Sequence, residues 1–316
     1  MPTFSLKFES FSTTPDAAGL GCAAVAFIIW GLSPLYWKLI ASVAPGEIIL
    51  HRIVWSLAVL LPLVMLSGRG GDFRQALAQP RTLALLGATS LLVAANWLIY
   101  IWAVNSGHVL EASLGYYINP LINVLLGVAF LGERLRRMQR WAVALAALGV
   151  AIQTAQYGRV PWISLALALS FGIYGLARKM AAVGALVGLT VETLLLAVPS
   201  LAVLIYLEAI GRGTFLHAGR QIDLLLCGSA MVTALPLLLF NLGARRLHLA
   251  TIGLLQYIAP SCMFLLAVWR YQEPVGTMRW LTFVLIWAGL ALYSADAVAA
   301  GRGRTASSGP QASARH

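Results

Sequence analysis

Long apolar runs separated by short polar gaps fill the chain from residue 19 to residue 296. A transmembrane helix needs about 20 apolar residues to cross the hydrocarbon core of a bilayer. Ten segments fit: Gly19–Ile40, Glu47–Leu66, Thr82–Asn105, Val109–Leu131, Gln139–Gln156, Val160–Lys179, Val187–Leu207, Asp223–Arg245, Ala250–Arg270 and Thr277–Asp296. The pattern predicts an all-α polytopic membrane protein with about ten transmembrane helices.

The composition excludes a water-soluble domain. Of the 316 residues, 60% are hydrophobic and only 10% are charged, too few to form a hydrated surface. A net charge of +11 would suggest nucleic acid as the partner of a soluble protein, but the 22 Lys and Arg fall mainly in the short gaps between apolar runs. They are topology signals, and we expect no nucleic-acid partner.

Lys and Arg in short loops resist translocation, so their distribution sets the orientation. With a cytoplasmic N-terminus, the inside segments carry 15 of them and the outside gaps carry 5. Both termini are therefore predicted to be cytoplasmic. Cys22, Cys227 and Cys262 lie inside apolar segments without metal-ligand spacing, so no metal or cofactor is expected.

The chain contains an internal repeat. Residues 114–133 and 254–273 align without a gap at a shift of 140, which superimposes identical residues. Tyr117, Ile118, Pro120 and Glu133 meet Tyr257, Ile258, Pro260 and Glu273. A unit of five spans crosses the membrane an odd number of times, so its second copy must be inverted. We expect a cytoplasmic N-terminal segment (1–18), two inverted five-helix repeats (19–157 and 158–297) and a disordered cytoplasmic tail (298–316).

Several segments resemble a known family. They are "WGLSPLYWKLI" (residues 30–40), "EIILHRIVWS" (47–56), "NWLIYIWAVN" (96–105), "LEASLGYYINPL" (110–121) and "FLGERLRRMQ" (130–139). With the two five-span halves, they resemble the EamA modules of the drug/metabolite transporter superfamily, and more specifically its RarD-type, chloramphenicol-sensitivity-linked branch. The resemblance implies a permease of the bacterial inner (plasma) membrane and does not supply a substrate.

Polar side chains inside predicted spans are the candidate substrate-binding residues, because each costs about 2.5 to 3.5 kcal/mol in hydrocarbon without a partner or an aqueous cavity. They offer amide, phenol and cation contacts suited to a small zwitterion or polar aromatic solute. The alternative is that they bond between helices. The candidates are Arg52, Asn96, Tyr116, Tyr117, Asn119, Gln256 and Tyr257.

Charged residues at span ends suggest a gate. Lys38, Glu47 and Glu111 are predicted at the outer ends of their spans, where they either snorkel to the interface or form an outer gate with Arg52. At the loops, Glu133 is expected to cap a helix and tie loops together rather than touch the solute.

Pro120 and Pro260 interrupt their spans at equivalent positions of the repeat. They are either ordinary kinks or paired hinges beside the cavity.

The expected function is an alternating-access transporter, and specifically an exporter, of a small organic metabolite or drug. The alternatives are a non-transporting membrane sensor or assembly protein and, further behind, a membrane-embedded enzyme, for which no catalytic motif is present. The sequence contains no ATP-binding P-loop, so transport is expected to be facilitated or driven by a coupling ion such as H⁺. Glu192 is the candidate carboxylate for binding this ion. The alternative is that Glu192 is merely solvated near the end of its span. The sequence is compatible with both a monomer and a homodimer.

Overall fold

The structure is a computed structural model that describes residues 16–105, 108–158, 160–270 and 276–307. Within these residues the chain is helical and contains no β-strand. The helices are α1 (Ala17–Leu39), α2 (Pro45–Leu66), α3 (Gly70–Ala78), α4 (Pro80–Asn105), α5 (Val109–Leu131), α6 (Arg137–Tyr157), α7 (Trp162–Met180), α8 (Ala185–Ala209), α9 (Arg220–Arg246), α10 (Leu249–Leu255), α11 (Ile258–Leu265), a π-helical turn (Leu266–Arg270) and α12 (Thr277–Ser307).

Eight segments in the described residues are long and apolar enough to cross a membrane, which confirms an all-α polytopic protein. They cover eight of the ten predicted spans. The other two predicted spans are also helical, as α6 and α12. In α6, polar residues near both ends, such as Arg140 and Gln153, shorten the apolar stretch. In α12 the apolar part is the shorter stretch Trp280–Asp296. α12 continues to Ser307, into the segment expected to be a disordered tail.

One helix was not predicted. The gap between the second and third predicted spans contains α3, which buries Phe73 and Ala76, three residues apart on one face. This short amphipathic helix lies beside α8 and carries too few apolar residues to be a span.

The ninth predicted span, Ala250–Arg270, is not continuous but breaks at Gln256 and Tyr257, between α10 and α11. Pro260 has no N–H, so the carbonyl of Gln256 cannot receive the usual helical hydrogen bond from it. The N–H of Ala259 bonds this carbonyl at 3.2 Å instead, and the helix tightens into a turn in which Gln256 and Tyr257 keep right-handed helical backbone angles. In contrast, α5 passes through Pro120 without a break.

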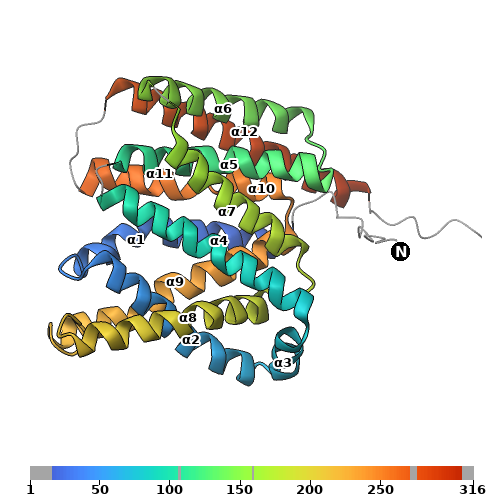
Figure 1. Cartoon of the computed structure of the whole chain (residues 1–316). Helices are drawn as coiled ribbons and strands as arrows, with labels where there is room; N and C mark the ends of the chain where they lie inside the picture. Colours follow the sequence, from blue (N-terminus) through green and yellow to red (C-terminus); the bar gives the residue numbers. More distant parts are fainter. Residues whose placement is uncertain (1–15, 106–107, 159, 271–275, 308–316) are drawn as a thin grey trace, which may run out of the picture.

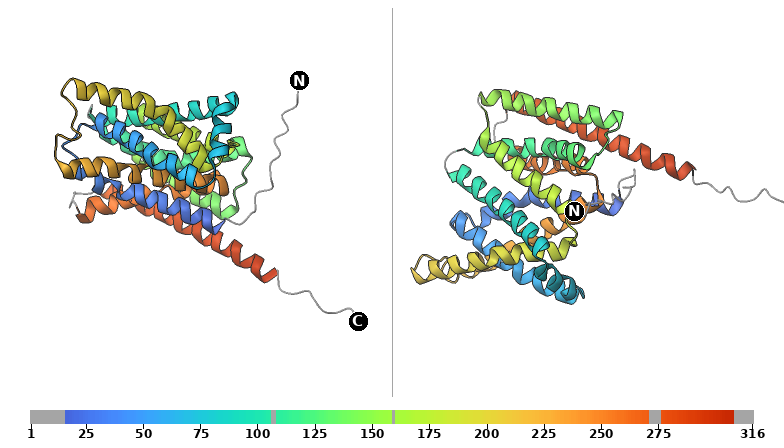
Figure 2. Two further views of the ribbon diagram at one scale, coloured as in Figure 1. Left: turned by 90° about the horizontal axis from the view of Figure 1, so that it is seen from below. Right: turned by 45° about the vertical axis from the view of Figure 1, so that its right-hand side comes forward.

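The helices form a layered bundle (Figure 1). α6 and α12 pair along one edge, α2, α3 and α8 lie at the opposite edge, and α1, α4, α7 and α9 lie between them. α2 packs on α8, α5 on α10 and α6 on α12. The end of α12 projects beyond the bundle on the side where α1 begins (Figure 2).

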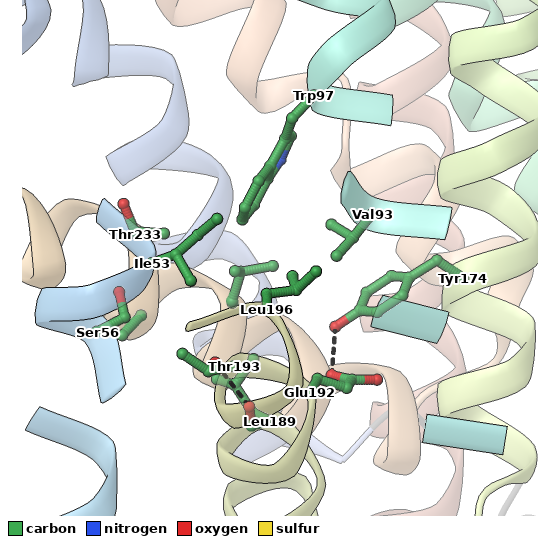
Figure 3. Close-up of a pocket in the computed structure, with 12 residues that line it drawn as sticks. Ile53, Ser56, Val93, Trp97, Tyr174, Leu189, Glu192, Thr193, Leu196 and Thr233 are labelled. Atoms are coloured by element: carbon green, nitrogen blue, oxygen red, sulfur yellow. Dashed lines mark hydrogen bonds between the residues drawn. The ribbon is translucent and has the colours of Figure 1, made fainter. Parts of the chain in front are cut away.

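An aromatic cluster fills the centre between α1, α7 and α9. The ring of Phe240 lies 6.0 Å from Phe27, 5.3 Å from Phe171 and 6.4 Å from Tyr174, measured between centroids. The cluster holds the ring of Tyr174 in place, and the hydroxyl of Tyr174 points from the cluster toward α8 (Figure 3).

Candidate functional site

A small cavity lies where α2, α4, α7, α8 and α9 meet (Figure 3). Its volume is about 20 Å³, room for about one water molecule. Apolar side chains and the indole of Trp97 form most of its wall. Polar groups reach it from four helices: Ser56, Tyr174, Glu192, Thr193 and Thr233.

Glu192 is the charged group of the cavity wall. It lies about two turns from the start of α8, near the span end as expected, but it is only 2% exposed, so the interpretation of Glu192 as a solvated residue is wrong. The hydroxyl of Thr89 on α4 donates to Oε1, and the hydroxyl of Tyr174 on α7 lies 3.5 Å from Oε2. Asn241 on α9 donates to the Tyr174 hydroxyl at 3.1 Å. The carboxylate thereby links α8 to α4 and α7, which lie in different halves of the chain.

Arg178 supplies the counter-charge to Glu192. Its Nε lies 3.6 Å from Oε1 of the carboxylate, and the side chain is 1% exposed. Space for the guanidinium exists because residue 188 is glycine: a Cβ there would lie 2.2 Å from Nη1 of Arg178. A buried ion pair of this kind is costly to break on one side only, since the remaining charge would lose its partner.

Arg52 lies next to the other end of the cavity. Its Nε donates to the Thr233 hydroxyl at 2.8 Å, and its guanidinium carbon lies 4.6 Å from the ring centroid of Trp37 and 5.1 Å from that of Trp97. Trp97 and Thr233 both line the cavity. Among the predicted substrate residues, Arg52 is therefore the one that the structure brings into contact with the cavity wall.

Of the predicted amide side chains, Asn96 and Gln256 bond between helices, and Asn119 bonds within α5. Asn96 donates to the carbonyl of Leu167 and to the hydroxyl of Ser170, both at 2.9 Å, which ties α4 to α7. Asn123 donates to Gln256 at 2.8 Å and more weakly to Asn119 at 3.3 Å. A contact of Asn96, Asn119 or Gln256 with solute stays a prediction.

The predicted tyrosines fall into two groups. Tyr117 and Tyr257 are buried in the core between α5, α11 and α12, where the Tyr257 hydroxyl donates to the Tyr117 carbonyl at 3.1 Å. Neither lines the small cavity. Tyr116 is 37% exposed and packs edge to face on Tyr100, with ring centroids 6.0 Å apart. Their role as solute contacts stays a prediction.

At the predicted gate, Glu47 is 5% exposed and is held by the loop between α8 and α9. The backbone N–H and the hydroxyl of Thr214 each donate to it at 2.6 Å, and His51 lies 3.8 Å away. Lys38 is exposed near the end of α1, and the side chain of Glu111 lies outside the described residues. Pairing of Lys38 or Arg52 with Glu47 or Glu111 stays a prediction.

Glu133 caps a helix, as predicted. Its two carboxylate oxygens accept the N–H groups of Leu249 at 2.6 Å and Ala250 at 2.9 Å, at the start of α10. Lys179 lies 3.9 Å away and His248 lies 3.7 Å away. Burial raises the pKa of Glu133, but the hydrogen bonds from His248 and the two N–H groups, with the charge of Lys179, outweigh it, and the pKa is lowered.

Sequence reasoning missed several groups around the cavity. The count of loop charges assigns Arg178 to topology, and no sequence pattern distinguishes Trp97, Tyr174, Thr89 or Thr233 as site residues. A signal existed in one case only: an Arg in one span and a Glu within the next span can pair if both face inward. In the described residues, no group of three His, Cys, Asp or Glu side chains could hold a metal ion.

Comparison with known proteins identifies relatives. Residues 17–154 match the EamA-like transporter family. An "Uncharacterized transporter" of Vibrio cholerae serotype O1 is 47% identical over 292 residues, 91% of this chain and 97% of that protein. "Protein RarD" of Escherichia coli (strain K12) is 44% identical over 283 residues, 89% of this chain and 95% of that protein. The family description and the name of the Vibrio protein are those of transporters, and neither relative carries the name of an enzyme.

A solved structure titled "Crystal structure of protein" has the same fold, with a TM-score of 0.69 and 19% sequence identity, over 89% of this chain and 98% of that one. At this identity the similarity concerns the fold alone.

Proposed function

This chain belongs to the EamA-like transporter family and is related to bacterial RarD proteins; from this premise we propose that it exports a small organic solute by alternating access between two inverted five-helix repeats. The observation that carries the proposal is the cavity between α2, α4, α7, α8 and α9, because it lies between the proposed repeats and combines aromatic and apolar walls with buried charged groups. Solute sites of transporters have this position and chemistry.

Helix pairing supports the inverted repeat. In this repeat the first half is α1, α2, α4, α5 and α6, and the second half, in the same order, is α7, α8, α9, α10–α11 and α12. Three of the packed pairs, α2–α8, α5–α10 and α6–α12, then join a helix to its own counterpart. The packing of α1 on α9 likewise corresponds to the packing of α4 on α7. A two-fold axis produces such reciprocal contacts, in which each half uses the same surface toward the other.

Close contacts at the α6–α12 pair repeat with the same shift of 140. A Cβ on Gly149 would lie 3.1 Å from the carbonyl oxygen of Thr282, and one on Gly289 would lie 2.7 Å from that of Ala142. Residues 142 and 149 of the first half thus exchange contacts with residues 282 and 289 of the second. Both glycines let the helix backbones approach, as is usual between membrane helices.

The break between α10 and α11 fits a carrier. Transporters often place discontinuous helices at the interface of their repeats, where unwound backbone lines the solute path. Here the break includes Gln256, one of the predicted solute contacts. The small volume of the cavity means that a solute fits only after the surrounding helices separate, which alternating access requires.

H⁺ is the proposed coupling ion, and Glu192 is its proposed site. The groups that face this carboxylate are Arg178 and Tyr174 from α7 and Thr89 from α4, with Ser56 of α2 on the same cavity. Arg245 of α9 interacts electrostatically with Arg178. Protonation would remove the negative charge that holds Arg178, and would thereby loosen α7 from α8.

Proteoliposomes test the proposal directly. Uptake and efflux of a metabolite panel are measured with and without an imposed pH gradient. We expect transport of at least one small organic compound, accelerated by the gradient in the wild type and in the control Glu208→Gln, whose side chain is exposed, but not in Glu192→Gln. If nothing in a broad panel is moved, the chain is better explained as a sensor or assembly protein. An equal gradient effect in all three proteins would exclude Glu192 as the coupling site.

A further inference from the structure

Arg52 is a cation placed inside the bundle. It is the eighth residue of α2, about 10 Å along the helix from Pro45. Its contacts come from α1, α4 and α9, so the guanidinium points among the helices and not into lipid. A charge at such a position is expensive and is kept where it binds a partner or a solute.

Two other cations inside the bundle, among the described residues, each have a carboxylate as partner. Arg178 faces Glu192 at 3.6 Å, and Lys179 faces Glu133 at 3.9 Å. Around Arg52 the described side chains are neutral: a threonine hydroxyl, two indole rings and the phenols of Tyr100 and Tyr116, which interact with it electrostatically. Within the described part of the chain, no carboxylate forms an ion pair with Arg52.

Most of the hydrogen-bonding capacity of Arg52 is also unused among the described residues. A guanidinium carries five N–H donors in one plane, and only the Nε hydrogen bonds an acceptor among the described residues. Indole faces attract the positive charge but accept no conventional hydrogen bond. The Nη hydrogens form a planar fork that matches the two oxygens of a carboxylate.

The residues that hold Arg52 also form the cavity wall. Thr233 and Trp97 contact the guanidinium and line the cavity, and the indole of Trp97 points toward the cavity centre (Figure 3). Beyond them the wall is largely apolar, with Val93, Leu196 and Leu237, and its carboxylate, Glu192, is paired with Arg178. A solute seated there would meet a cation at one end and an apolar surface along its body.

We propose that the transported solute is an organic anion, a carboxylate on an apolar or aromatic body, and that Arg52 binds its carboxylate. This inference rests on the proposed transport function and adds the chemical class of the solute. The carboxylate would take the bidentate position on the guanidinium, and Trp97 would pack against the body.

Three probes with one body and different charges test the class: 3-phenylpropionate, 3-phenylpropionamide and 3-phenylpropylamine. Binding to the purified protein in neutral detergent is followed by tryptophan fluorescence, because Trp37 and Trp97 flank the guanidinium. We expect the wild type to bind the acid about tenfold or more tightly than the amide. Arg52→Gln should lose this preference, and Arg52→Lys should keep part of it, because it retains the charge without the fork.

Arg140→Gln is the matched control, because Arg140 is an exposed arginine of α6. It should bind like the wild type. The inference is overturned if the wild type binds the amide or the amine as well as the acid, or if Arg52→Gln keeps the preference for the acid. It is also overturned if the acid binds only after Glu111→Gln, since Glu111 would then be the counter-ion of Arg52.

Uptake of the same probes into phosphatidylcholine vesicles separates the two proposals. Arg52-dependent binding of the acid without transport of any compound would remove the transport function and leave the anion site. Transport of neutral or cationic compounds that is unchanged in Arg52→Gln would leave the function and remove the anion site. If phosphatidylglycerol, and not the acid, gives the Arg52-dependent fluorescence change, Arg52 binds a lipid head group and the inference fails.

Discussion

At the scale of the residue, buried charges differ in what neutralises them. Glu133 is bound by two backbone N–H groups and two basic side chains, and Glu192 by Arg178 and two hydroxyls. Arg52 has neutral neighbours among the described residues. The surroundings of Glu133 are a structural arrangement at a loop. Glu192 and Arg52 adjoin the cavity, where a proton or a solute could change their interactions.

The cap by Glu133 has a testable stability effect. Glu133→Gln should lower the free energy of unfolding by about 1 to 2 kcal/mol, because α10 loses a charged acceptor at its first N–H groups. A folded pKa below the usual 4.5 means that the carboxylate stabilises the protein above that pH and less as pH falls through the lowered value. Thermal unfolding in detergent between pH 3 and pH 7 measures this.

The control for this measurement is Glu208→Gln, whose side chain is 54% exposed and, among the described residues, pairs with the exposed His217. It should unfold close to the wild type near pH 7. If Glu133→Gln is as stable as the wild type at pH 7, or if their difference grows toward pH 3, the cap contributes no charge-dependent stability.

At the scale of the element, equivalent prolines have different effects. Pro120 sits in the continuous helix α5, whereas Pro260 follows the break between α10 and α11. The local hydrogen bonds explain the difference, since the Gln256 carbonyl bonds Ala259 in a tight turn. As hinges the two prolines would therefore not be equal, and the larger rotation is expected at Pro260.

Pro260→Ala should let α10 and α11 join into one helix and slow exchange between the two access states by roughly tenfold. Proline costs a helix interior ~3 kcal/mol, and about half of this, added to the barrier for exchange, corresponds to a tenfold slower rate. Pro120→Ala should have a smaller effect, because α5 is already continuous. Solute exchange in proteoliposomes, with membrane insertion as the control, measures both. Normal exchange in the double variant would reduce the prolines to passive kinks.

At the scale of the whole molecule, the cavity depends on helices that are far apart in sequence. α2 and α4 meet α7, α8 and α9 there, so neither half alone forms the site. Movement of one half against the other would open the site to one side of the membrane at a time.

The orientation of the whole molecule is predicted by its loop charges. A reporter that is active only in the cytoplasm should be active when fused after Arg304 and silent when inserted between Glu208 and Ile222, in the gap between α8 and α9. The reverse pattern would mean that both termini lie outside. Activity at both sites would instead indicate an even number of spans between them, where the predicted topology has three.

The sequence by itself determined the helices and the family. Apolar runs of about 20 residues can satisfy their backbone hydrogen bonds in lipid only as helices, so the spans follow from local composition. The family resemblance rested on contiguous motifs, and the relatives confirm it. The role of Glu133 as a cap could also be predicted, because a carboxylate at a loop commonly binds free N–H groups.

The tertiary structure alone decided which polar residues share a site. Glu192 and Thr89 lie 103 positions apart, and Arg52 and Thr233 lie 181 apart, and no local pattern links such pairs. The break at Gln256 was equally hidden, because Pro120 and Pro260 match in sequence and differ only in how their surroundings bond the freed carbonyl. Site chemistry depends on these long-range contacts, which the packing of helices creates.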